Sequence, residues 1–149
     1  MPRGTLEVIL VSAKGLHSSD FLKKMDPYVI LTYRTQEHRS SVAKGAGSKP
    51  RWNESFLFTV SDSATELNLR LMDQDTFSKD DFLGEAKINL EAVFVEGSVP
   101  ETAYNVVKDQ NYCGEVKVAL AFNPERGNQF GFGEEESNIG GWRESVKDY

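Results

Sequence analysis

The sequence contains one cysteine, Cys113, and two histidines, His17 and His38, among 149 residues. A single cysteine excludes an intramolecular disulfide framework and a cysteine-based zinc site. Neither histidine stands in a pattern that indicates a nucleophile with its base, so we predict that the protein is not an enzyme. No run of eighteen apolar residues is present, and the N-terminal residues lack the apolar segment of a signal peptide. We therefore expect the protein in the cytosol.

Nearly every ordered stretch of the sequence has the pattern of a β-strand. Runs rich in β-branched and apolar residues are separated by clusters of Gly, Ser, Asn, Asp and Pro. About eight such runs occur, at 5–13, 27–34, 38–43, 54–60, 66–73, 82–90, 103–107 and 114–122. A helical turn is expected only within 90–97. The pattern predicts an all-β fold, an eight-stranded antiparallel Greek-key β-sandwich.

The composition changes after Phe122. The segment that follows is rich in Gly, Glu, Ser and Asn and shows no periodicity. We predict a folded domain over 1–123 and a flexible acidic tail over 124–149. Such a tail either only solvates the protein or carries a short binding motif around Trp142, because an exposed tryptophan often anchors a partner.

Residues 71–84, "LMDQDTFSKDDFLG", place four aspartates within nine positions directly after an alternating apolar run. An EF-hand loop is excluded because Phe77 and Ser78 occupy its fifth and sixth positions and strands flank the segment. A phosphatase of the haloacid-dehalogenase type also has the pattern D-x-D-x-T, but it needs alternating strands and helices. A cradle of oxygen ligands for Ca²⁺ remains.

Ca²⁺ takes about six to eight oxygen ligands, which is more than one loop usually supplies. The segment "SSDFLKKMDPYV" offers a second acidic loop, with Asp20 and Asp26 six residues apart. Taken alone, these two could equally be turn aspartates, because Asp before Pro is common in turns. Five aspartates on two loops at strand ends favour a metal site.

The segments "SSDFLKKMDPYVIL", "KPRWNESFLFTV" and "MDQDTFSKDDFLGEAKINL", in this order and spacing, resemble a C2 domain over about residues 4–123. The resemblance implies that five aspartates on two apical loops bind two or three Ca²⁺ ions. They match Asp20, Asp26, Asp73, Asp75 and Asp81 here. Asp80 is an alternative to Asp81, but the spacing to Gly84 favours Asp81. The carbonyls of Phe21, Met25 and Gln74 are implied as further ligands.

The order of the predicted strands also carries information. The chain opens on the strand that leads into the first acidic loop, and it ends on an extra strand at 114–122. This order resembles the C2 variant that is circularly permuted relative to synaptotagmin, called type II. A small single C2 domain with a tail rich in Gly and Glu further resembles the plant elicitor-responsive and 16-kDa phloem protein group.

The resemblance implies a Ca²⁺-dependent phospholipid-binding signalling module of plant defence. Residues 1–123 contain 14 Lys and Arg against 17 Asp and Glu, a net charge of −3, which becomes +2 without the five ligand aspartates. Bound Ca²⁺ would therefore remove the repulsion from anionic membranes. We expect a cytoplasmic monomer that binds the plasma membrane when Ca²⁺ rises. The expected membrane contacts are Phe21, Leu22, Lys23, Lys24, Phe77 and Lys79.

Two other functions stay open. Relatives in the phloem-protein group suggest RNA binding or trafficking, although a net charge of −6 gives little attraction for phosphates. The tail suggests an adaptor for protein partners. A basic stretch is present as well, but Glu37 interrupts it, so it does not predict phosphoinositide specificity; its members are Arg34, His38, Arg39, Lys44, Lys49 and Arg51.

Overall fold

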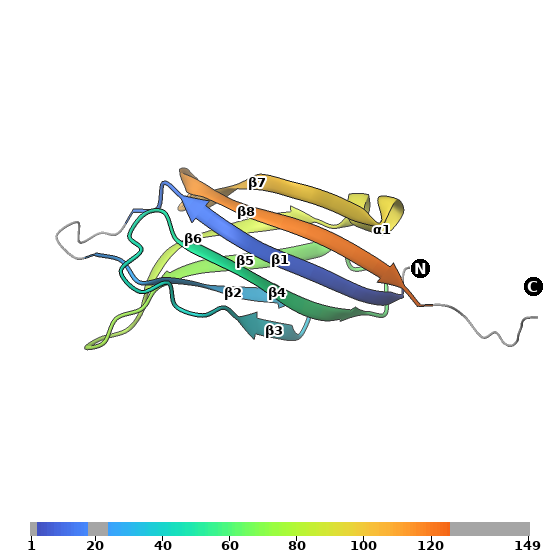
Figure 1. Cartoon of the computed structure of the whole chain (residues 1–149), viewed down its shortest axis with the longest axis horizontal. Helices are drawn as coiled ribbons and strands as arrows, with labels where there is room; N and C mark the ends of the chain where they lie inside the picture. The colour runs from blue at the N-terminus through green and yellow to red at the C-terminus, as the bar shows by residue number, and fades with distance from the viewer. Residues whose placement is uncertain (1–2, 18–23, 126–149) are drawn as a thin grey trace, which may run out of the picture.

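The computed structural model describes residues 3–17 and 24–125, which form eight strands and one short helix (Figure 1). The strands are β1 (Gly4–Lys14), β2 (Pro27–Tyr33), β3 (Gln36–Arg39), β4 (Arg51–Val60), β5 (Glu66–Asp73), β6 (Asp81–Asn89), β7 (Ser98–Lys108) and β8 (Asn111–Pro124). The helix α1 (Glu91–Glu96) lies between β6 and β7. The predicted all-β fold with eight strands is confirmed.

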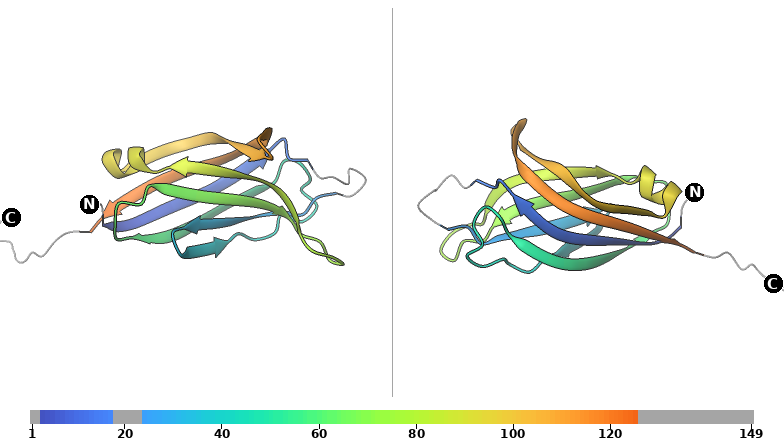
Figure 2. Two further views of the ribbon diagram at one scale, coloured as in Figure 1. Left: turned by 180° about the vertical axis from the view of Figure 1, so that it is seen from behind. Right: turned by 45° about the horizontal axis from the view of Figure 1, so that its top comes forward.

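All strand pairs are antiparallel, and the strand order is β3-β2-β5-β6-β7-β8-β1-β4. The sheet folds into two layers, one with β2, β3, β5 and β6 and the other with β1, β4, β7 and β8 (Figures 1 and 2). β6 and β7 join the layers through one register pair, Glu85 opposite Val107. β1 lies between β4 and the last strand, β8, as the type II topology requires.

Side chains of β3 cover the free edge of β4. The Gln36 amide donates to Thr59 O at 2.7 Å and accepts from Thr59 N at 2.8 Å. His38 Nε2 lies 2.8 Å from Leu57 O, and its ring packs edge-on against Phe58. Unpaired strand edges invite pairing with other chains, and these contacts occupy the backbone groups that would do so. The two edges of the sheet thus close on each other.

The core follows from strict alternation along the strands. Leu67, Leu69 and Leu71 of β5 are buried, and so are the inward residues of the opposite layer, such as Leu6 and Val8 of β1. Trp52 and Phe58 are buried too, with Phe56 packed against the core. Truncating one such leucine to alanine would cost about 2–5 kcal/mol.

Four strands differ from the sequence-based expectation by three or more residues at an end. β4 and β8 begin at Arg51 and Asn111, each three residues earlier than expected. β3 ends at Arg39 because Ser40 is buried and its hydroxyl accepts a hydrogen bond from Val29 N at 2.8 Å. β7 begins at Ser98, earlier than expected, because the chain leaves α1 at Gly97 directly onto β8, where Phe122 N donates to Gly97 O. The predicted helical turn is present as α1.

The described parts of the connections β1–β2, β3–β4 and β5–β6 lie at one end of the molecule, and the chain ends of the described part lie at the other (Figure 1). β8 continues to Pro124; the remainder of the predicted tail, with Trp142, lies outside the described residues. Within residues 3–17 and 24–125, no helix has the length and apolarity to cross a membrane.

Candidate metal site at the loop end

Three neighbouring strands end in aspartates at the loop end of the molecule. Asp73 is the last residue of β5, and its register partners are Pro27 on β2 and Asp81 on β6. Asp26 directly precedes Pro27. The sheet therefore places Asp26, Asp73 and Asp81 on three adjacent strand ends. Antiparallel pairing alternates direction, so the end of β5 meets the starts of β2 and β6 at the same edge.

The two acidic segments are tied together at the base of this site. Asp26 N donates to Asp73 Oδ1 at 2.9 Å, and Gln74 N donates to Asp26 O at 3.0 Å. The Asp73 side chain is 1% exposed. A buried carboxylate is costly unless donors or a cation compensate it. The amide of one predicted ligand thus fixes the carboxylate of another.

The β3–β4 connection also contacts the acidic site. The sequence did not identify this connection as part of the site. Gly45 N donates to Asp26 Oδ1 at 2.6 Å, and Gly47 N donates to Met25 O at 3.1 Å. Gly45 has φ = 66°, a left-handed conformation that glycine adopts without strain. The sequence signal was the pair of glycines in "KGAGS", which allows a backbone amide to approach a carboxylate.

Asp75 organises its own loop. Its Oδ1 accepts from Phe77 N at 2.9 Å and Ser78 N at 3.2 Å, and its Oδ2 accepts from Ser78 Oγ at 2.8 Å. These contacts shape the tip, where the Phe77 side chain is 97% exposed. Lys79 beside it and Lys24 on the first loop are exposed too. The tip of this loop therefore presents an aromatic ring and a basic side chain to solvent.

Asp80 is engaged by protein groups instead. Its Oδ1 accepts from Asp75 N at 2.9 Å and its Oδ2 accepts from the Tyr28 hydroxyl at 2.5 Å. The hydrogen bond from the Asp75 backbone, followed by that from Tyr28, lowers the pKa of Asp80. Burial, followed by the bond to Asp80, raises the pKa of Tyr28. The sequence reasoning considered Asp80 only as a metal ligand and did not identify Tyr28 as its partner.

The predicted ligands fit Ca²⁺ by their chemistry, since carboxylate and carbonyl oxygens at a loop end are its preferred donors. Among residues 3–17 and 24–125, no three His, Cys, Asp or Glu side chains form a group that could hold a metal ion. The expected ligands Asp20 and Phe21 and the expected membrane contacts Leu22 and Lys23 lie outside the described residues. Of the expected carbonyl ligands, Met25 O accepts from Gly47 N.

Half of the basic stretch is committed to internal contacts. Arg34 pairs with Asp62 at 2.7 Å, and His38 contacts β4 as described. The Arg39 guanidinium lies over the Tyr28 ring, 4.5 Å from its centroid. The other three members, Lys44, Lys49 and Arg51, are exposed. The structure thus gives a physical reason, beyond Glu37, for not expecting a dense cationic surface here.

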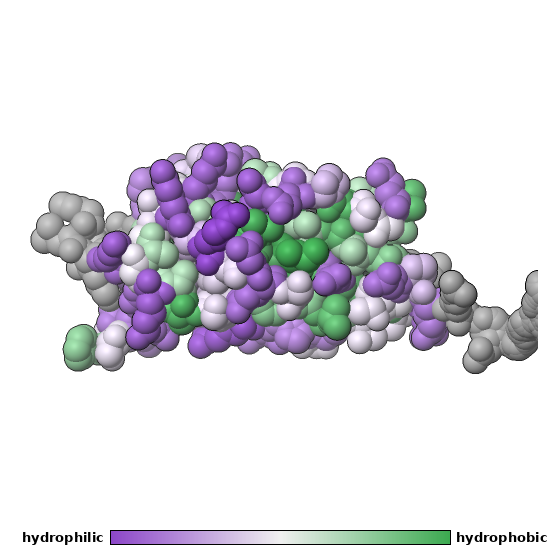
Figure 3. All heavy atoms as spheres, viewed as in Figure 1, coloured by the Kyte–Doolittle hydropathy of each residue, from purple (hydrophilic) through white to green (hydrophobic). Residues whose placement is uncertain are grey.

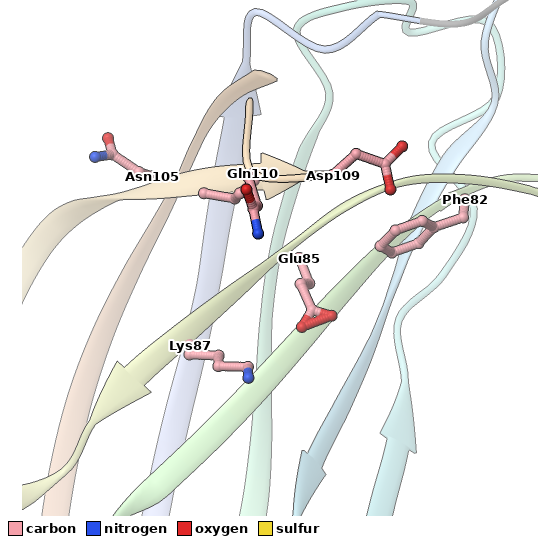
Figure 4. Close-up of a pocket in the computed structure, with 7 residues that line it drawn as sticks. Phe82, Glu85, Lys87, Asn105, Asp109 and Gln110 are labelled. Atoms are coloured by element: carbon pink, nitrogen blue, oxygen red, sulfur yellow. The ribbon is translucent and has the colours of Figure 1, made fainter. Parts of the chain in front are cut away.

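A groove of about 590 Å³ opens beside the single β6–β7 register pair (Figure 4). Its lining mixes one lysine with two carboxylates, two amides and two apolar side chains, namely Lys87, Glu85, Asp109, Asn105, Gln110, Phe82 and Val107. One lysine against two carboxylates leaves a net formal charge of −1 spread over a mixed lining, so the groove has no concentrated charge of either sign.

Comparisons with known proteins agree with this geometry. The C2 domain family model matches residues 4–106. The chain is 57% identical to 16 kDa phloem protein 2 of Arabidopsis thaliana over all of both chains. It is 56% identical to elicitor-responsive protein 3 of Oryza sativa subsp. japonica over 97% of this chain and 99% of the relative.

Solved structures agree as well. A C2 domain-containing protein from a putative elicitor-responsive gene, 59% identical, superposes with a TM-score of 0.75 over 86% of this chain and 94% of that one. A calcium-bound structure of extended-synaptotagmin 2 is 29% identical, with a TM-score of 0.70 over 82% of this chain and 46% of that one.

Proposed function

Because the chain belongs to the C2 domain family, we propose that it binds anionic phospholipid membranes when Ca²⁺ fills the loop-end site. The family and its extended-synaptotagmin neighbours support a membrane-binding domain in general. Ca²⁺ dependence is our proposal, and so are the ligands Asp20, Asp26, Asp73, Asp75 and Asp81. We also propose that the module is a monomer without catalytic activity, and that it moves from the cytoplasm to the plasma membrane.

The observation that carries this proposal is the placement of Asp73. Its carboxylate is 1% exposed, it is bonded to the amide of Asp26, and Asp81 is its register partner. Like charges on neighbouring strand ends destabilise one another, whereas a divalent cation between them reverses the sign of that interaction. A strand end that only had to turn the chain would not need three aspartates.

Membrane contact would follow from the same loops. With Ca²⁺ bound, the positive side chains of Lys24 and Lys79 would act without opposition, each contributing about 1 kcal/mol near an anionic surface. Phe77, 97% exposed at the loop tip, would enter the interfacial region. Phe21, Leu22 and Lys23 would join it from the first loop, and bound lipid phosphates would complete the coordination of two or three ions together with the carbonyls of Phe21, Met25 and Gln74.

Sedimentation with phosphatidylserine-containing liposomes tests the proposal. The protein should pellet with these liposomes in Ca²⁺ and remain in the supernatant with chelator. It should not pellet with liposomes made of phosphatidylcholine alone. Lys79→Gln should weaken pelleting modestly, whereas Lys87→Gln, an exposed lysine of β6 six residues beyond Asp81, should not. Equal pelleting in Ca²⁺ and in chelator would contradict Ca²⁺ dependence.

The relatives' names favour one alternative, a role in phloem, and RNA is the partner that the sequence analysis left open for it. The net charge of −6 opposes it, because phosphate contacts dominate affinity for nucleic acids. A filter-binding assay over a range of salt concentrations distinguishes the two. Tight RNA binding without Ca²⁺, combined with no liposome binding in Ca²⁺, would favour the alternative.

An adaptor role for the tail would instead appear as protein binding that is lost when residues 126–149 are removed.

A further inference from the structure

Asp80 is joined to β2 directly through Tyr28, and to β3 through Tyr28 and Arg39. Its Oδ2 accepts from the hydroxyl of Tyr28 on β2, and Arg39 on β3 donates to the same hydroxyl at 3.3 Å. The Arg39 guanidinium also stacks on the Tyr28 ring. We call Tyr28, Arg39 and Asp80 the Tyr28 cluster.

The register explains why these residues meet. Ile30 pairs with Arg39, and Tyr28 lies two residues before Ile30, on the same face of β2. This is the outer face, yet Tyr28 is only 2% exposed. Arg39 covers the ring from the diagonal position, and Met72, the register partner of Tyr28 on β5, lies on the other side. Tyr28 is therefore buried on the outer face because the neighbouring side chains Arg39 and Met72 cover it.

The other carboxylate oxygen of Asp80 closes the metal loop. Asp80 Oδ1 accepts from Asp75 N at 2.9 Å, so one side chain connects the two ends of the loop segment 75–80 and anchors both to β2. Hydrogen bonds to an ionised carboxylate are stronger than those between neutral groups. The backbone position of Asp75 therefore depends on Asp80. Since the Asp75 side chain starts from that backbone, the position of its carboxylate depends on Asp80 as well.

We propose that Asp80 is a positioning residue, held by Tyr28 and Arg39, that sets the loop conformation in which Asp75 binds the metal. This inference rests on the proposed function. Adjacent aspartates thereby have separate roles. Asp81, the register partner of Asp73, is the metal ligand, and Asp80 orders the loop before the metal arrives. Ordering a site in advance strengthens binding, because less conformational freedom is lost on binding.

The test compares three variants in the metal-free and the Ca²⁺-bound protein. Tyr28→Phe removes only the hydroxyl, and Asp80→Ala removes the carboxylate at a partly exposed position without opening a buried cavity. Tyr33→Phe is the matched control. It removes another buried hydroxyl, bonded to Ala64 O at 2.9 Å, from the far end of the same strand. All three should lower thermal stability, so stability alone does not discriminate between them.

Hydrogen exchange of the Asp75 amide, followed by NMR without metal, reports on the cluster directly. Its exchange should become roughly tenfold faster in Asp80→Ala and severalfold faster in Tyr28→Phe, and stay unchanged in Tyr33→Phe. Calorimetric titration with Ca²⁺ should show affinity reduced about three- to tenfold in the first two variants and unchanged in the control. The double variant Tyr28→Phe/Asp80→Ala should bind no more weakly than Asp80→Ala alone.

Unchanged exchange at Asp75 in Tyr28→Phe would overturn the inference. So would complete loss of Ca²⁺ binding in Asp80→Ala, which would make Asp80 a ligand, or an equal loss of affinity in Tyr33→Phe. A parent protein that binds no Ca²⁺ would overturn the proposed function and, with it, this role in metal binding. The hydrogen-bonded cluster itself would still be confirmed or refuted by exchange at Asp75.

Discussion

The backbone amide of Asp26 donates a 2.9 Å hydrogen bond to the carboxylate of Asp73, a residue 47 positions further along the chain. Each residue ends or precedes a strand, and each belongs to a different acidic loop. The contact makes the two loops one structure before any metal is bound. A mutation in either loop should therefore change the conformation of both.

Ca²⁺ should raise the melting temperature of the protein, because it binds the folded site and hardly at all the unfolded chain. At a hundredfold excess over the dissociation constant, the gain is about 2.7 kcal/mol. Mg²⁺ at the same concentration should do much less, since it demands octahedral geometry and loses its water reluctantly. Differential scanning fluorimetry in chelator, Mg²⁺ and Ca²⁺ measures this. Equal shifts with both ions would indicate unspecific screening.

Phe77→Ala should weaken liposome binding in Ca²⁺ while leaving the melting temperature and Ca²⁺ affinity unchanged. The side chain is 97% exposed and contributes no core contact, so its removal costs no packing. Leu57→Ala, at a residue 59% exposed on the layer of β1, β4 and β8, is the matched control and should bind liposomes as the parent does. Apolar side chains gather over the middle of that layer, away from the loops (Figure 3). Equal losses in both variants would place the membrane contact elsewhere.

Gly84→Ala should destabilise the fold strongly. Gly84 has φ = 145°, and an added Cβ would lie 2.6 Å from Val106 Cγ1 and 2.8 Å from Cys113 Sγ. Overpacking and backbone strain together should lower the free energy of unfolding by about 2–4 kcal/mol. Gly45→Ala also requires a strained φ but meets no atom within 4 Å, so its cost should be smaller. Chemical denaturation measures both, and a Gly84→Ala protein as stable as the parent would refute the packing at β6.

The Cys113 thiol should react slowly with Ellman's reagent at neutral pH. Burial raises its pKa, with Lys108 acting in the opposite direction, and Sγ donates to Leu83 O at 3.3 Å. Because only the thiolate attacks, the rate near neutral pH should be lower than that of free cysteine. The rate should rise with pH over a range above that of free cysteine. A reaction as fast as that of free cysteine at the same pH would contradict this.

The strands and the positions of the aspartates could be predicted because each rests on local pattern. Leu67, Leu69 and Leu71 alternate with polar residues, and Asp73 to Asp81 have a characteristic spacing. The choice between Asp80 and Asp81 depends on the β5–β6 register, and the bulge between Leu71 and Met72 shifts that register. Gly84 lies beside this bulge, and an isolated glycine in a strand often marks one, which is why the spacing to Gly84 could favour Asp81 from the sequence.

The Tyr28 cluster could not be predicted from the sequence. Alternation along β2 places Tyr28 on the outer face and predicts exposure. Its burial depends on Arg39, which reaches it only through the pairing of β2 with β3. The Gly45 amide at Asp26 likewise depends on how the β3–β4 connection folds.

Asp73→Asn is the decisive variant for the metal site, because it keeps the shape and the acceptor for Asp26 N but removes one charge. The control must lose one charge without losing an internal contact. Asp62 does not meet this condition, since it pairs with Arg34 and accepts from Ala64 N. Glu101→Gln removes one charge from an exposed position on β7 and serves instead.

The most direct measurement is therefore isothermal titration calorimetry of Ca²⁺ into the parent, Asp73→Asn and Glu101→Gln. We predict saturable binding to the parent and to Glu101→Gln with equal affinity, and loss of most of it in Asp73→Asn. Binding that is absent from the parent, or unchanged in Asp73→Asn, would contradict a Ca²⁺ site at the ends of β2, β5 and β6.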